Sequence, residues 1–64
     1  MDTNRSAEEI ALAILDVDAQ YGEELITQRQ ADQREIRLWR EAARTGHGLK
    51  VTELLSQPNF GNRK

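Results

Sequence analysis

Few residues in this 64-residue chain have side chains suited to bond-making chemistry. The chain has one histidine and no cysteine, and it has no glycine-rich phosphate loop. His47 lies between Gly46 and Gly48, a setting typical of an exposed loop, so we interpret it as a loop residue rather than as a ligand for metal or phosphate. We therefore expect a protein that is not an enzyme, with no catalytic residue, no cofactor and no metal site.

The carboxylates do not change this expectation. Glu8–Glu9 and Glu23–Glu24 are adjacent pairs, each placed where a helix is predicted to start. Acidic side chains in a first turn are stabilised by the helix dipole, which explains both pairs without acid–base catalysis. The segment from Asp16 resembles the start of a calcium-binding loop. It has Tyr21 and Thr27 where such a loop needs glycine and glutamate, so we predict no calcium site.

The most informative stretch is 28–44, which divides into two faces at helical spacing. The apolar face covers roughly 160° and contains Ala31, Ile36, Leu38, Trp39, Ala42 and Ala43. The opposite face is rich in arginine and glutamine and is interrupted only by Glu41. We take five of its residues as a candidate binding face: Arg29, Gln33, Arg37, Arg40 and Arg44.

Three interpretations of this basic face are open. It can be a solvated surface on which Glu41 pairs with Arg37 and Arg44, at helical spacings of four and three. It can bind an acidic protein partner. It can also bind DNA or RNA, because arginine bonds phosphate and guanine in a bidentate manner and glutamine reads adenine.

The segment that precedes this one has apolar residues on two sides of a helix. Ile10, Ile14 and Val17 form one stripe, and Leu12 and Leu15 lie on another. A helix that is apolar on two sides is usually covered on two sides, and so short a chain has little of its own to cover both. We expect a homo-oligomer at micromolar concentration. The predicted protein interface contains Leu12, Leu15, Leu38 and Trp39.

These residues require helices to position them, and the sequence predicts an all-α fold: a helical hairpin plus a short C-terminal third helix. Ser6 and Glu9 form a capping-box pattern that starts a helix over about 7–20. Gly22 is expected to end it in the left-handed conformation, and Glu23 would then begin the second helix. The alternative is one long bent helix in which Gly22 is tolerated, at a cost of about 1 kcal/mol.

The second helix is predicted to end at Gly46, and a third over about 50–57 is stopped by Pro58. We expect residues 1–5 and 58–64 to be flexible tails of a single domain, 1–64. The side chains predicted to be largely buried are Ile14, Val17, Ile36, Trp39 and Leu54.

Charge is unevenly distributed along the chain. Residues 1–24 hold one arginine and seven acidic residues, whereas residues 25–64 hold eight basic and four acidic residues. The sequence has no apolar run long enough to span a membrane and no signal-peptide pattern, so we expect a cytoplasmic protein or one carried by a virus particle.

These observations lead to one leading function and two alternatives. We predict a non-enzymatic protein–protein interaction or assembly module that associates with itself and has no membrane partner. The alternatives are a small regulator that binds DNA or RNA through the basic face, and a small subunit of a larger complex.

Overall fold

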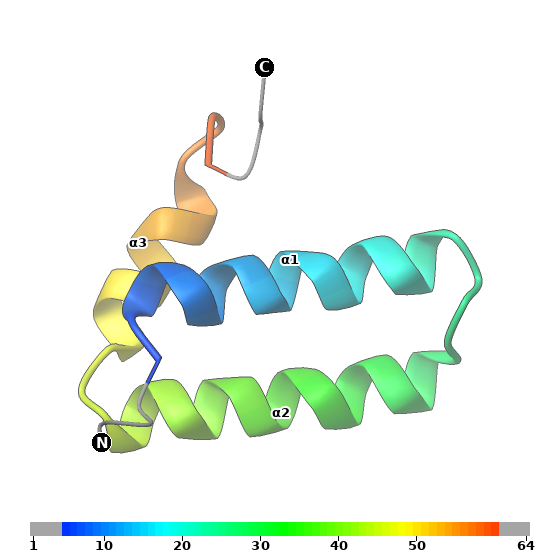
Figure 1. Ribbon diagram of the computed structural model, residues 1–64, viewed down its shortest axis with the longest axis horizontal. Coiled ribbons are helices and arrows are strands. Elements are labelled where there is room, and N and C mark those ends of the chain that lie inside the picture. Colours follow the sequence, from blue (N-terminus) through cyan, green and yellow to red (C-terminus); the bar gives the residue numbers. More distant parts are fainter. Residues whose placement is uncertain (1–4, 61–64) are drawn as a thin grey trace.

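The computed structural model describes residues 5–60, which form three helices joined by two short connections (Figure 1). Helix α1 spans Ala7–Gly22, α2 spans Gln28–Arg44 and α3 spans Gly48–Ser56. α1 and α2 lie side by side and antiparallel, and α3 crosses them at the end far from their connecting loop. The predicted all-α hairpin with a short third helix is confirmed, and the single long helix is wrong.

The predicted tails fall largely outside the described residues, which exclude 1–4 and 61–64. The part of the second tail that is described is not free of the fold. Pro58, Asn59 and Phe60 form a turn after α3, and Phe60 is half-buried against the core.

Both helices of the hairpin begin with a complete capping box. The Glu9 backbone N–H donates to Ser6 Oγ at 3.2 Å, and the Ser6 N–H donates to Glu9 Oε1 at 2.8 Å, as predicted. Thr27 and Gln30 make the same reciprocal pair at 3.2 and 3.0 Å. Because this second box fixes the start of α2, the prediction that the helix begins at Glu23 is wrong.

Both helices of the hairpin also end in the same type of turn. The Leu25 N–H donates to the Gln20 carbonyl at 2.8 Å, and the His47 N–H donates to the Ala42 carbonyl at 2.7 Å. In this Schellman arrangement one residue adopts the left-handed conformation. That residue is Gly46 after α2, with φ 79°, as predicted, but after α1 it is Glu24, with φ 62°. Gly22 was wrongly expected in this role, because α1 continues through it.

The core lies between the three helices and consists of small and aliphatic side chains. Its buried members are Ala7, Ile10, Ala11, Ile14, Val17, Ala31, Leu38, Ala42, Val51 and Leu54. Four of these ten residues are alanines. No polar side chain of the described residues is buried, so the core is held together by apolar packing alone.

Three of the five predicted core residues are confirmed: Ile14, Val17 and Leu54. Trp39 is only half-buried, although it packs against the core. Ile36 is 50% exposed, so its predicted burial is wrong. The buried stripe of α2 is centred on Leu38, and residues two apart on a helix point about 160° away from each other. Ile36 therefore faces solvent when Leu38 faces α1.

Candidate binding face

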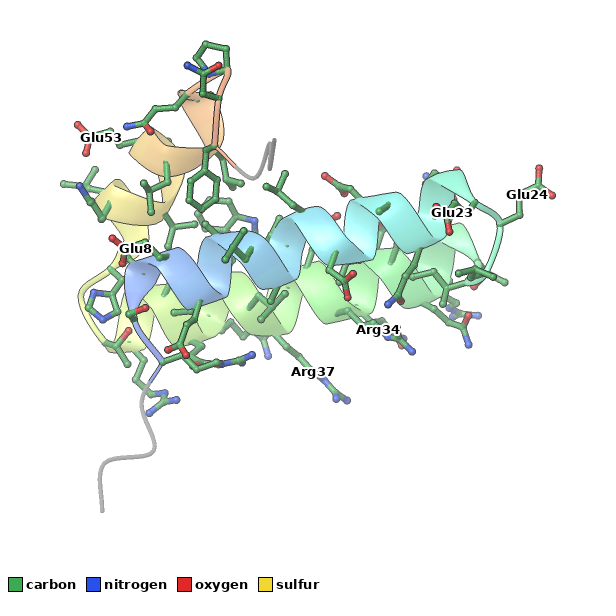
Figure 2. The ribbon with its side chains drawn as sticks, turned by 45° about the horizontal axis from the view of Figure 1, so that its top comes forward. Glu8, Glu23, Glu24, Arg34, Arg37 and Glu53 are labelled. Carbon is green, nitrogen blue, oxygen red and sulfur yellow. The ribbon has the colours of Figure 1, made fainter. Side chains whose placement is uncertain are left out.

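Packing of α2 against α1 turns the predicted basic face outward. Because Ala31, Leu38 and Ala42 occupy the inner side, the five predicted site residues all lie on the outer side and are all exposed. In Figure 2, Arg34 and Arg37 project from α2, and Arg34 reaches the edge of α1, where it bonds Gln20; Glu8 lies on α1 and Glu23 directly follows it. From Arg29 to Arg44 the face extends about 23 Å along the helix.

Glu41, the acidic residue that interrupts the basic face in the sequence, is already bonded to a residue from elsewhere. Arg5, which precedes α1, holds it in a bidentate ion pair, with Nε donating to Oε2 at 3.0 Å and Nη2 donating to Oε1. This bond lowers the pKa of the Glu41 carboxyl and raises that of the Arg5 guanidinium. The expected pairs of Glu41 with Arg37 and Arg44 do not form within residues 5–60.

An apolar side chain lies among the arginines. Ile36, half exposed, lines a shallow hollow together with Gln33, Arg37 and Arg40. The sequence placed Ile36 on the buried side, so this feature of the face was missed. The face therefore combines guanidinium groups that form no ion pair with other described residues and a central aliphatic contact.

A second set of polar contacts lies beside this face, in the groove between α1 and α2. Arg34 donates to Gln20 Oε1 at 2.8 Å, and Gln20 Nε2 donates to Asp16 at 3.1 Å. Arg5 and Arg37 line the same groove above an apolar floor that includes Val17 and Leu38. Helical spacing could not reveal this cluster, because it joins residues from separate segments of the chain.

Carboxyl groups meet across the hairpin at Asp18 and Glu35. A hydrogen bond to Asp18, partial burial and the negative charges of Asp18 and Asp32 together raise the pKa of Glu35 to about 7. The raised pKa shows that two ionised carboxylates are unfavourable at this point.

The predicted interface residues divide into two groups. Leu38 is 8% exposed and packs inside the chain, so it has almost no surface to offer a partner. Leu12 and Leu15 are half-buried, and neither packs against the buried core. Trp39 does pack against the core and keeps part of its ring exposed. Self-association through Leu12, Leu15 and Trp39 stays a prediction.

The described part of the chain holds neither a metal-binding cluster nor a membrane-spanning helix. Residues 5–60 contain no group of three or more His, Cys, Asp or Glu side chains arranged to hold a metal ion. Nor does any helix in this range combine the length and apolar character required to cross a membrane.

Comparison with known proteins gives no relative on which to base a function. No family model matches the sequence, no curated protein matches it, and no solved structure matches the fold. A function for this chain is therefore inferred from the chemistry of its surface.

Proposed function

We propose that this chain is a non-enzymatic interaction module that binds an acidic, partly apolar surface of a protein partner through the outer face of α2. The observation that carries the proposal is the composition of this exposed face. It presents Arg29, Arg37, Arg40 and Arg44 around a half-exposed Ile36. Arg5 neutralises Glu41, and the exposed Asp32, one turn before Ile36, is the other carboxylate at its edge. Arginine is enriched at protein interfaces because it combines charge, planar hydrogen bonding and apolar stem atoms.

Ile36 favours a protein partner over a nucleic acid. A phosphate backbone offers charge and hydrogen-bond acceptors but no extended apolar surface for an isoleucine. An amphipathic helix of a partner can offer both, with leucines against Ile36 and glutamates against the surrounding arginines. The net charge of −2 for the whole chain also gives little general attraction to a polyanion.

Binding to DNA or RNA is the second candidate, and the distribution of charge supports it. Glu8 lies on α1 and Glu23 follows that helix, while the arginines lie on the outer side of α2 (Figure 2). A polyanion can therefore approach α2 without first meeting α1. If the five site residues follow a groove, affinity for duplex DNA falls with salt by roughly 0.9 log units per log unit of salt for each phosphate contact.

Fluorescence anisotropy with three labelled probes separates these candidates. The first is a helical peptide with glutamates flanking a leucine stripe, the second is a scrambled peptide of the same composition, and the third is a 20-base-pair DNA duplex. We expect the full chain to bind the first peptide at least about tenfold more tightly than the other two, because only that peptide aligns acidic and apolar groups with α2. Equal binding of both peptides, or no binding, contradicts the proposal.

Two variants locate the contact. Arg37→Gln combined with Arg40→Gln should weaken peptide binding by about tenfold or more. The matched control, Arg63→Gln with Lys64→Gln, removes the same charge outside the described residues and should leave binding nearly unchanged. Ile36→Ser should weaken binding of the peptide only. DNA binding that is lost in the arginine variant and unaffected by Ile36→Ser would establish the second candidate.

A further inference from the structure

The loop between α1 and α2 carries an exposed apolar cluster with an acidic rim. Leu25 is 68% exposed and Tyr21 is 45% exposed, and together with Ile26 they line an open hollow of about 550 Å³. Glu23 and Glu24 lie beside it, exposed, and neither forms an ion pair with another described residue. Clustered apolar side chains at a surface, unlike single ones, mark a contact with another molecule.

The backbone conformation of Glu24 also distinguishes this loop. Its φ of 62° is left-handed, which is unfavourable for glutamate and easy for glycine. Glu24 also lines the hollow. The chain thus holds a carboxylate at the rim of the hollow in a conformation that another residue would adopt at lower cost, as residues at binding sites often do.

A complementary feature lies at the opposite end of the molecule. Leu49, at the start of α3, is 90% exposed, the highest value among the large apolar residues described. Basic side chains lie near it in the sequence. Lys50 follows directly, with its side chain 53% exposed and in an exposed ion pair with Glu53 at 3.5 Å, and the exposed Arg44 ends α2. Figure 1 places the start of α3 and the α1–α2 loop at opposite ends of the hairpin, so a single chain cannot bring the two features together.

We infer that copies of this chain associate head to tail, with Leu49 of one copy seated in the loop hollow of the next. Arg44 of the first copy, together with Lys50 released from its exposed pair with Glu53, then meets Glu23 and Glu24 of the second, so both apolar and charged groups are matched. Because the two surfaces differ, each copy keeps one of them free, and growth continues into a ring or an open chain. This contact does not rest on the proposed function of α2, although Arg44 belongs to both surfaces.

The contact area is small, so the association is weak. Stable interfaces bury more than about 1,000 Å², which two patches of this size cannot provide. Sedimentation velocity and ¹⁵N NMR on the full chain, from about 20 µM to 1 mM, cover the appropriate range. We expect species larger than a dimer at the highest concentration, with shifted amide signals in the α1–α2 loop and at the start of α3. A monomer throughout this range overturns the inference.

Two single variants test the head-to-tail geometry. Leu49→Glu removes the inserted side chain and keeps the hollow, whereas Leu25→Glu alters the hollow and keeps Leu49. Each variant alone should lose at least about tenfold in association, because a buried leucine is replaced by a charge. Mixed in equal amounts they retain one intact contact, so they should form a dimer that does not grow further. Failure of the mixture to associate overturns the inference.

Control variants separate this contact from the other surfaces. Ile36→Ser, which weakens the proposed α2 contact, should leave head-to-tail association unchanged, and Leu49→Glu should leave peptide binding to α2 unchanged. Leu12→Glu should also leave the association unchanged. If Leu12→Glu abolishes it while Leu49→Glu does not, the copies meet through α1 instead. Far-ultraviolet circular dichroism must show unchanged helix content for every variant, since all four substituted positions lie at least partly at the surface.

Discussion

The two ends of the hairpin differ in how they are built. At the α3 end, Ile10, Ala11, Ala42 and Val51 have no exposed surface, and the left-handed position of the turn is occupied by glycine. At the loop end, Leu25 and Tyr21 are exposed, and the equivalent position of the turn is occupied by Glu24. The same turn geometry therefore closes a packed region at one end and presents a surface at the other. Stability is concentrated near α3, and the binding surface we infer lies where packing is thin.

The first prediction breaks the well-packed end. Ile10→Ala removes a fully buried side chain and leaves a cavity, which should lower the free energy of unfolding by about 2–5 kcal/mol. A loss of this size is a large fraction of the total stability of a chain this short, so much of the protein would be unfolded. Val17→Ala, nearer the loop and 6% exposed, removes fewer atoms and should cost less. Urea denaturation followed by Trp39 fluorescence measures both variants, and an equal loss in the two would contradict a gradient of packing.

The second prediction compares substitutions at the two left-handed turn positions, Gly46 and Glu24. Gly46→Ala forces a side chain into the left-handed conformation and should lower stability by about 1–2 kcal/mol. Glu24→Gly relieves the same strain and should raise stability by up to about the same amount, less the extra entropy of glycine in the unfolded chain. No neighbouring atom lies within 4 Å of a side chain added at Gly46, so the backbone conformation alone is tested. Thermal unfolding should show shifts of opposite sign.

The third prediction compares the two capping boxes. Ser6→Ala removes the cap of α1 and Thr27→Ala removes the cap of α2, each at a cost of about 1 kcal/mol. The residue before α3, His47, makes no side-chain capping bond, so His47→Ala should change the free energy of unfolding by less than about 0.5 kcal/mol. Amide hydrogen exchange should show that Thr27→Ala speeds exchange mainly near the loop, whereas uniform acceleration would indicate that the hairpin opens as one unit.

The fourth prediction uses the carboxyl groups of Asp18 and Glu35, which repel each other when both are ionised. The pKa of Glu35 is raised from 4.5 to about 7, so the folded chain binds a proton that the unfolded chain has released between these values. Stability contributed by protonated Glu35 is complete below about pH 4.5 and is lost as the pH rises through about 7.

The glutamine in the Glu35→Gln variant cannot ionise. The free energy of unfolding of this variant, relative to that of the wild type, should therefore rise between about pH 4.5 and 7 and stay constant above pH 7. The effect is modest because Asp18 is exposed and solvent screens the pair. Denaturant melts at pH 4.5, 6 and 8 test this expectation. Glu53→Gln, which removes an exposed carboxylate of α3 and its pair with Lys50, gives the background. A constant difference between Glu35→Gln and wild type at all three pH values would contradict the assignment.

Local sequence patterns determined the helices of this protein and most of their ends. Ser6 with Glu9 and the glycine at position 46 act through bonds within a few residues, so their roles can be read from the sequence alone. The Thr27–Gln30 box was equally local and could have been recognised. The exposure of Arg29, Gln33, Arg37, Arg40 and Arg44 also followed from helical spacing, since one side of a helix in a small domain must face solvent.

Tertiary packing decided the rest. Which stripe of α2 faces α1 depends on the fit of both helices, and that fit selected the line through Ala31, Leu38 and Ala42 and left Ile36 exposed. The Arg5–Glu41 pair and the Asp18–Glu35 contact join residues that are distant in the sequence, so no spacing rule could predict them. Glu24, not Gly22, adopts the left-handed conformation because α1 remains helical through Gly22, and only the loop geometry reveals this. The sequence determined which residues form helices, and packing between the helices determined which of their side chains are left to bind a partner.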